Sequence, residues 1–167
     1  MRRILVLFLA LMLYPLSSQA QGPVKQLPGD LTLEQAQTVL NAALAKSKAQ
    51  GVPMNITVVD AGGNLKAFAR EDGAFLGSID VSKKKAITAR FFNMSSADLG
   101  AAAQPGKELF GIEVTNGGLV IFGGGELLVH NGVIVGAIGV SGGSVAEDTA
   151  VAKAGAAALS NAAKKKN

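Results

Sequence analysis

An Asn-Gly pair between two apolar runs is the feature that most restricts the fold of this chain. Asn131 and Gly132 suit the two positive φ angles of a type I′ turn. The flanking runs, residues 126–129 and 133–140, have the length and composition of strands, and a third apolar run occupies residues 119–122. We therefore predict two or three antiparallel strands in the second half of the chain.

Further elements are predicted from capping residues and periodicity. Thr32 and Gln35 have the spacing of a capping box that opens a helix ending near Gly51, and residues 54–70 have the pattern of a β-hairpin. Helices are also expected from Ser78 to Phe91, from Ser95 or Ser96 to about Gln104, and from Ser144 to about Ala158. The predicted class is α/β (α+β), with an antiparallel sheet of about five strands and helices packed on it.

The first twenty residues have the pattern of a secretory signal peptide. Arg2 and Arg3 precede an apolar run over residues 4–14, and Ser18 and Ala20 supply the small residues that signal peptidase needs. The run is about half the length that a transmembrane helix requires, so membrane insertion is not expected. We expect cleavage near Ala20 and a periplasmic or secreted protein.

The remaining sequence suggests one domain without disulfides. Residues 21–30 are a predicted flexible lead-in, residues 31–160 the domain, and residues 161–167 a basic tail. The chain has no Cys, so its stability must come from packing. Loss of Arg2 and Arg3 lowers the formal charge from +4 to +2, which argues against nucleic acid as a partner.

A glycine turn between a buried strand and a capped helix is the first candidate site. Residues 136–144 run into Ser144, so backbone N–H groups converge at the positive end of a helix, a geometry that binds carboxylate or phosphate. Alternatively, the glycines only permit a tight turn, and Ser144 satisfies the free amides itself. Both interpretations remain open.

Charged and aromatic side chains give weaker indications. Helical spacing allows Lys85 to point inward and suit an anionic ligand, although a solvated lysine is the preferred interpretation, and Lys83 and Lys84 are expected in water. His130 is a metal-ligand candidate, although a solvent-exposed turn residue is the preferred interpretation. Six Phe of the expected mature chain can line an apolar pocket, although core packing is the preferred interpretation for most of them: Phe68, Phe75, Phe91, Phe92, Phe110 and Phe122. We identify no catalytic triad and no zinc-ligand spacing.

Four motifs in order resemble one family. They are residues 58–65 (VVDAGGNL), 70–74 (REDGA), 85–89 (KAITA) and 131–143 (NGVIVGAIGVSGG), the last followed by Glu147 and Asp148. The chain resembles the GlcG/HbpS-like or haem-degrading domain family, which is related to the C-terminal domain of PduO-type corrinoid adenosyltransferases. The resemblance covers residues 31–159, nearly the whole expected mature domain.

The resemblance implies a profilin-like fold, a homo-oligomer that is often an octamer, and haem as a candidate cofactor. Carried over by motif, the expected ligand-binding residues are Arg70, Lys85, Thr88, Ser141, Gly142, Gly143 and Ser144. Our leading hypothesis is an exported protein that binds haem or a related tetrapyrrole. The alternatives are an enzyme or accessory protein acting on a small carboxylate such as glycolate, and a structural oligomer without a ligand.

Overall fold

The computed structural model describes residues 29–164, so the predicted signal peptide, most of the lead-in and the end of the basic tail lie outside the described residues. Each element is named here with its bounds: α1 (Leu33–Gln50), β1 (Asn55–Asp60), β2 (Leu65–Arg70), α2 (Ser78–Phe92), α3 (Ser96–Ala102), the 3-10 helix η1 (Ile112–Val114), β3 (Gly125–His130), β4 (Val133–Ser141) and α4 (Val145–Lys164). No helix in this part of the chain is long and apolar enough to cross a membrane.

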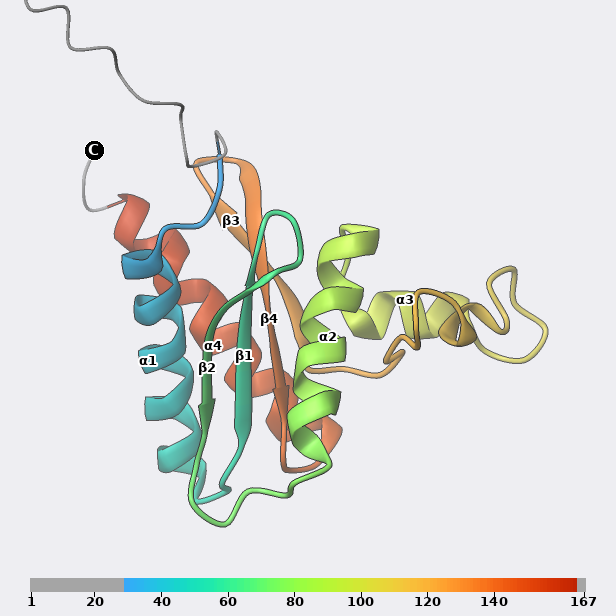
Figure 1. Ribbon diagram of the computed structural model, residues 1–167, viewed down its shortest axis with the longest axis horizontal. Helices are drawn as coiled ribbons and strands as arrows, with labels where there is room; N and C mark the ends of the chain where they lie inside the picture. Colours follow the sequence, from blue (N-terminus) through green and yellow to red (C-terminus); the bar gives the residue numbers. More distant parts are fainter. Residues whose placement is uncertain (1–28, 165–167) are drawn as a thin grey trace, which may run out of the picture.

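The four strands form one antiparallel sheet in the order β2-β1-β4-β3. Figure 1 shows α1 and α4 on one side of this sheet and α2 on the other. The β2 and β3 strands are the edges, so the two predicted hairpins meet where β1 pairs with β4. Figure 1 also shows that α3 and the chain that follows it project away from the sheet.

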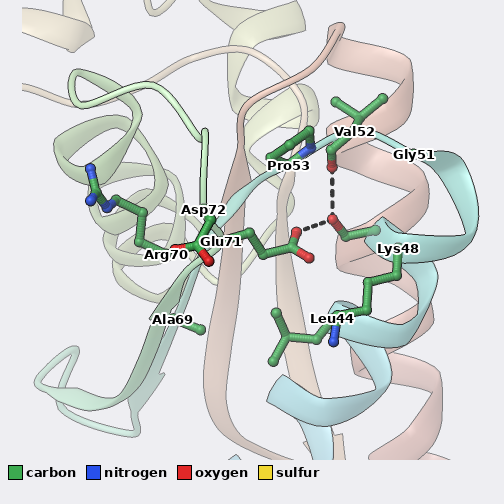
Figure 2. Close-up of a pocket in the computed structure, with 10 residues that line it drawn as sticks. Leu44, Lys48, Gly51, Val52, Pro53, Ala69, Arg70, Glu71 and Asp72 are labelled. Carbon is green, nitrogen blue, oxygen red and sulfur yellow. Dashed lines mark hydrogen bonds between the residues drawn. The ribbon is translucent and has the colours of Figure 1, made fainter.

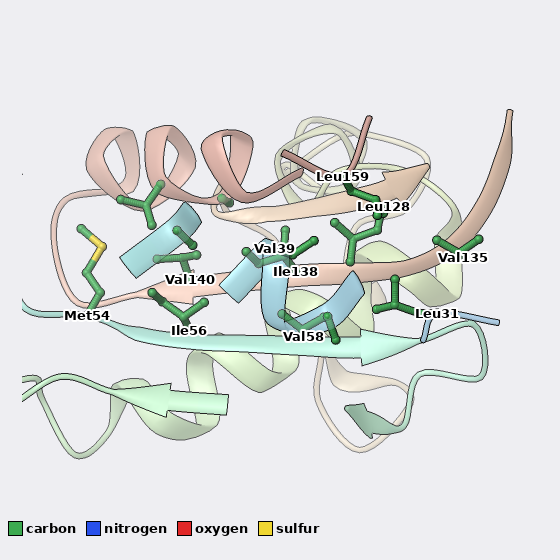
Figure 3. Close-up of a cluster of buried hydrophobic side chains, with 14 residues drawn as sticks. Leu31, Val39, Met54, Ile56, Val58, Leu128, Val135, Ile138, Val140 and Leu159 are labelled. Carbon is green, nitrogen blue, oxygen red and sulfur yellow. The ribbon is translucent and has the colours of Figure 1, made fainter. Parts of the chain in front are cut away.

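Successive side chains of the central strands β1 and β4 point to opposite faces of the sheet, which divides the core into two layers. On one face, Ile56 and Val58 of β1 pack with Ile138 and Val140 of β4 against α1 and α4 (Figure 3). On the other face, a smaller group formed by Val59, Ala86, Ala89 and Ala137 joins the sheet to α2. The larger layer holds the fold together, and the smaller one sets the position of α2.

Local sequence signals account for several element boundaries. The capping box at the start of α1 is present, because Gln35 N–H donates to Thr32 Oγ1 and Thr32 N–H donates to Gln35 Oε1. The Asn-Gly turn is also confirmed, with φ of 50° at Asn131 and 79° at Gly132. Gly139 permits close packing, because a Cβ there would collide with the backbone of Ser82 and Ala86 in α2.

The prediction of about five strands was wrong, because residues 119–122 do not form a strand. Their backbone donors are used elsewhere: Leu119 N–H donates to the Glu113 carbonyl oxygen, and Val120 N–H donates to Thr88 Oγ1. An apolar run predicts burial but does not specify which groups its backbone will pair with. Here the hydroxyl of the buried Thr88 on α2 accepts a hydrogen bond that a neighbouring strand would otherwise accept.

Candidate functional site

Lys85 points inward from α2 and is completely buried. Its Nζ lies 2.7 Å from Asp148 Oδ2 on α4, and it donates to the Val140 carbonyl oxygen at 2.9 Å. The Phe122 ring covers the ammonium, with its centroid 4.8 Å from Nζ. Lys85, a predicted ligand-binding residue, therefore already has a carboxylate partner from its own chain.

Burial lowers the pKa of Lys85, because desolvation penalises the charged ammonium. The hydrogen bond and the charge of Asp148 act in the opposite direction and favour the ammonium. We refer to Lys85, Asp148 and Phe122 as the buried lysine centre. It joins α2, α4 and the segment before β3, and β4 contributes the Val140 carbonyl oxygen, so the partners of Lys85 all come from its own chain.

The predicted anion-binding turn is also occupied by side chains of α4. Gly143 N–H donates to Asp148 Oδ1 at 3.0 Å, and Ser144 N–H donates to Glu147 Oε2 at 2.8 Å. This backbone hydrogen bond lowers the pKa of Glu147. Glu147 N–H in turn donates to Ser144 Oγ at 3.3 Å, which completes a capping box. Two of the amides expected to meet a ligand are therefore satisfied within the chain.

Three other predicted residues have clear structural positions. Ser141 is buried at the end of β4, and a Cβ at Gly142 would collide with Pro53 and Met54 in the loop before β1. Thr88 is buried on α2, where its hydroxyl accepts the N–H of Val120 at 3.1 Å. These residues fix the end of β4 and the course of the chain before β3.

Arg70 lies apart from the buried lysine centre, at the end of the edge strand β2. It is opposite Asn55 of β1, which is opposite Ser141 of β4, so the three residues form one row across the sheet. In the row two residues further along the same strands, Phe68 is opposite Thr57, and the Thr57 hydroxyl lies 2.9 Å from the Ser82 hydroxyl on α2. Because side chains two residues apart share a face, Arg70 and Phe68 both lie on the α2 side.

The larger of two notable hollows, with a volume of about 550 Å³, lies between the end of α1 and the end of β2. Glu71 points into it and accepts hydrogen bonds from Ser47 Oγ and Met54 N–H, whereas Arg70 points away (Figure 2). Its lining residues are Leu44, Ser47, Lys48, Gly51, Val52, Pro53, Ala69, Arg70, Glu71 and Asp72. The carboxylates of Glu71 and Asp72 offset the cations Lys48 and Arg70 in this lining, so the hollow offers no net positive charge to a ligand that carries several negative charges.

A smaller hollow of about 230 Å³ lies on the opposite face of β2, beside α2. It is lined by Thr57, Leu65, Phe68, Ile79 and Lys83. Leu65 and Phe68 come from β2, whereas Ile79 and Lys83 are one turn apart on α2. The hollow is therefore mainly apolar, with one ammonium group at its wall.

Exposed apolar side chains extend this surface beyond the hollow. We define the β2–α2 face as Leu65, Phe68, Phe75, Leu76 and Ile79, all of which are exposed. Phe75 and Leu76 lie in the loop that leads into α2 and are 70% and 72% exposed. An apolar group of this kind on one side of a small domain indicates an interaction site.

Sequence reasoning missed this face because it treated most of the phenylalanines as core residues. None of the six is buried: Phe92 is half-buried, and the other five are exposed. Lys83 was expected in water and is exposed, yet it also lines the hollow. The helical spacing of Ile79 and Lys83 was an available signal. Strand alternation was not, because it places Leu65 and Phe68 on opposite faces, and only the register shift between Val58 and Val59 brings them to the same side.

His130 ends β3, next to the Asn-Gly turn. It is partly buried rather than fully exposed, and its Nδ1 has no hydrogen-bond partner. Between residues 29 and 164, no group of three or more His, Cys, Asp or Glu side chains could hold a metal ion. His130 therefore remains an isolated candidate ligand at the hairpin.

Comparisons with known proteins agree with the motif resemblance. An uncharacterised 15.0 kDa protein from the dhaT-dhaS intergenic region of Citrobacter freundii is 41% identical over 124 residues, which cover 74% of this chain and 87% of that protein. The corrinoid adenosyltransferase PduO of Citrobacter freundii is 35% identical over 77% of this chain, but the match covers only 39% of PduO.

Solved structures and a family model extend this relationship. The crystal structure of a PduOC:heme complex is 34% identical with a TM-score of 0.74, and the match covers 78% of this chain and 95% of that structure. The sequence model of the family described as haem degrading protein HbpS-like matches residues 31–157, most of the chain. The chain therefore belongs to the HbpS-like family of haem-degrading proteins.

Proposed function

We propose that this protein binds haem or a related tetrapyrrole on the β2–α2 face. The observation that carries the proposal is a set of exposed apolar side chains on one face, flanked by the cations Lys83 and Arg70. The relationship to PduOC, which has been crystallised with heme, supports the choice of ligand.

The residues of this face suit the chemistry of a porphyrin. A porphyrin is a flat apolar ring with two carboxylates at one edge, so it needs an apolar wall and nearby cations. Phe68, Leu65 and Ile79 provide the wall, and Lys83 and Arg70 provide the cations. The larger hollow is less suitable, because Glu71 and Asp72 offset its cations and leave no net attraction for the propionates.

The donors available to iron on this face are weak. Among the residues that line the smaller hollow, Lys83 carries the only nitrogen donor in a side chain, and His130 belongs to the hairpin at the other edge of the sheet. Haem, when bound, supplies a redox-active iron, but here we expect apolar contact and propionate pairing to dominate its affinity. Iron-free protoporphyrin IX should then bind nearly as well as haemin.

Absorbance titration of the purified protein with haemin tests the proposal. We expect a shift of the Soret band at micromolar haemin, and fluorescence titration with protoporphyrin IX should give an affinity within about tenfold of that for haemin. Absence of a Soret shift would contradict haem binding. Tight binding of haemin without binding of protoporphyrin IX would instead show that an iron ligand dominates.

A small carboxylate such as glycolate has less support as the ligand. The N–H groups of Gly143 and Ser144 that would donate to it are already in use, because each donates to a carboxylate of α4. The ammonium of Lys85 is likewise paired with Asp148. Tetrapyrrole binding uses groups that remain accessible, which is why we prefer it.

We also propose that the protein works outside the cytoplasm. The support is the basic, apolar and small-residue pattern of residues 1–20, with a cleavage site near Ala20. Fractionation of cells that express the full chain, followed by mass determination, tests this proposal. A periplasmic or secreted product that begins near Gln21 is expected, and an intact cytoplasmic chain would contradict export.

A further inference from the structure

A long segment between α3 and β3 projects from the domain without much regular structure. We call residues 103–122 the arm; it contains only the three-residue helix η1. Figure 1 shows the arm extending away from the sheet beyond α3. Segments of this length without their own secondary structure are uncommon in compact domains and are usually functional.

The end of the arm that joins β3 is firmly attached to the domain. Val120 N–H donates to Thr88 Oγ1, Ser96 Oγ donates to the Phe122 carbonyl oxygen at 2.7 Å, and the Phe122 ring covers Lys85. Gly100 of α3 also lies against the backbone of Ile121, where a Cβ would collide. The arm is therefore held in a defined direction.

The outer part of the arm exposes large apolar side chains. Phe110 is 64% exposed and Val114 is 81% exposed. Exposed apolar groups on a well-anchored segment indicate a surface that another molecule covers. Glu108 and Glu113 accompany them against a single cation, Lys107, so the arm carries a net negative charge.

The β2–α2 face has the complementary properties. It is apolar, its flanking cations are Lys83 and Arg70, and its hollow of about 230 Å³ is smaller than the roughly 300–1,000 Å³ of typical ligand pockets. One chain therefore supplies a wall for a tetrapyrrole but does not enclose it. A chain's own arm does not complete the site, because it joins β3, whereas the face lies at β2 on the opposite edge of the sheet.

We propose that the arm of a second copy of this chain packs against the β2–α2 face and forms the outer wall of the tetrapyrrole site. Phe110 and Val114 of one copy then meet Phe68 and its neighbours on the other, and the acidic groups of the arm approach Lys83 and Arg70. Because two different surfaces meet, each copy can both give and receive an arm, which produces a closed ring or a chain of copies. The role in tetrapyrrole binding rests on the proposed function, whereas the contact between copies does not.

Light scattering after size-exclusion chromatography of the ligand-free protein tests the contact. We expect the wild type to be an oligomer and both Phe110→Asp and Phe68→Asp to give smaller species. Leu33→Asp is the matched control, because Leu33 is 55% exposed on α1 and should leave the mass unchanged. A monomeric wild type, or Phe110→Asp and Phe68→Asp proteins of wild-type mass, would overturn the proposal.

A charge exchange tests which surfaces meet. Glu108→Lys with Glu113→Lys should weaken assembly, and adding Lys83→Glu with Arg70→Glu should restore part of it. Absence of any recovery, with assembly still dependent on Phe110, would show that the arm docks elsewhere and overturn the proposed pairing.

Haemin titration separates this inference from the proposed function. Phe110→Asp should weaken haemin binding about tenfold, although Phe110 does not line the hollow of its own chain. If the wild type fails to bind haemin but Phe110→Asp and Phe68→Asp still dissociate the oligomer, the proposed function fails and the contact stands. If haemin binding depends on Phe68 but not on Phe110, the function stands and the shared wall is refuted.

Discussion

Two lysines on the same helix, Lys83 and Lys85, have opposite environments. Lys85 is buried against Asp148 and Phe122, whereas Lys83 lies at the surface and lines an apolar hollow. Residues two positions apart on a helix are separated by about 200° around its axis, so one side chain faces the core when the other faces solvent. The comparison teaches that the buried lysine centre maintains the fold, and that the β2–α2 face is where a ligand can bind.

The largest expected effect follows from removing the partner of the buried ammonium. Asp148→Ala leaves Lys85 buried and unpaired, which should lower the free energy of unfolding by about 3–5 kcal/mol. Asp80→Ala is the control, because Asp80 forms an exposed pair with Lys84 at 2.9 Å, and it should cost at most about 1 kcal/mol. Urea denaturation measures both. Equal losses would contradict a structural role for the buried lysine centre.

A smaller loss is expected where α2 packs against β4. Gly139→Ala places a methyl group against the backbone of Ser82 and Ala86, so α2 must shift. We expect a loss of about 1–3 kcal/mol in the free energy of unfolding, with weaker haemin binding because Lys83 moves with the helix. Gly132→Ala, in the open hairpin turn, is a control that should leave haemin binding unchanged. Unchanged stability in Gly139→Ala would show that the packing is looser than described.

The pH dependence of stability reports on the buried lysine. Burial lowers the pKa of Lys85 in the folded state, while the unfolded chain keeps the ordinary value of 10.5. Between the lowered pKa and 10.5, the unfolded state binds more protons, so the Lys85 contribution to the free energy of unfolding rises with pH. Denaturation of the wild type and of Lys85→Met across this range should show that rise only in the wild type. Parallel pH profiles would contradict it.

The smallest effect on stability is expected at the exposed lysine. Lys83→Ala should change the free energy of unfolding by no more than about 0.5 kcal/mol, because its ammonium has no buried partner. Haemin affinity should nevertheless fall several-fold, as one cation for the propionates is lost. Lys46→Ala, on the exposed side of α1, controls for net charge. Equal haemin affinities in the two variants would exclude Lys83 from the site.

The sequence signals that predicted the fold well are local ones. The capping residues Thr32 and Gln35 and the Asn131-Gly132 turn determine nearby backbone geometry, and both occur as predicted. The expected fifth strand failed because its pairing depends on Thr88, which lies 32 residues from Val120. Local patterns specify conformation, but they do not identify a distant hydrogen-bond partner.

The candidate site was less predictable for the same reason. Helical spacing indicated that Lys85 could point inward, but nothing near it identified Asp148, 63 residues away, as its partner. The alternation of β2 placed Phe68 on one face of the sheet without showing that α2 leaves that face partly uncovered. Whether an apolar side chain belongs to a core or to a binding face depends on the layer above it.

The most direct test of the central claim is the haemin affinity of Phe68→Asp compared with that of Leu33→Asp. Both substitutions place a carboxylate at an exposed apolar position, but only Phe68 lines the hollow beside α2. Absorbance titration should give a dissociation constant at least about tenfold higher for Phe68→Asp and a wild-type value for Leu33→Asp. Wild-type affinity in both variants would show that haem does not bind on the β2–α2 face.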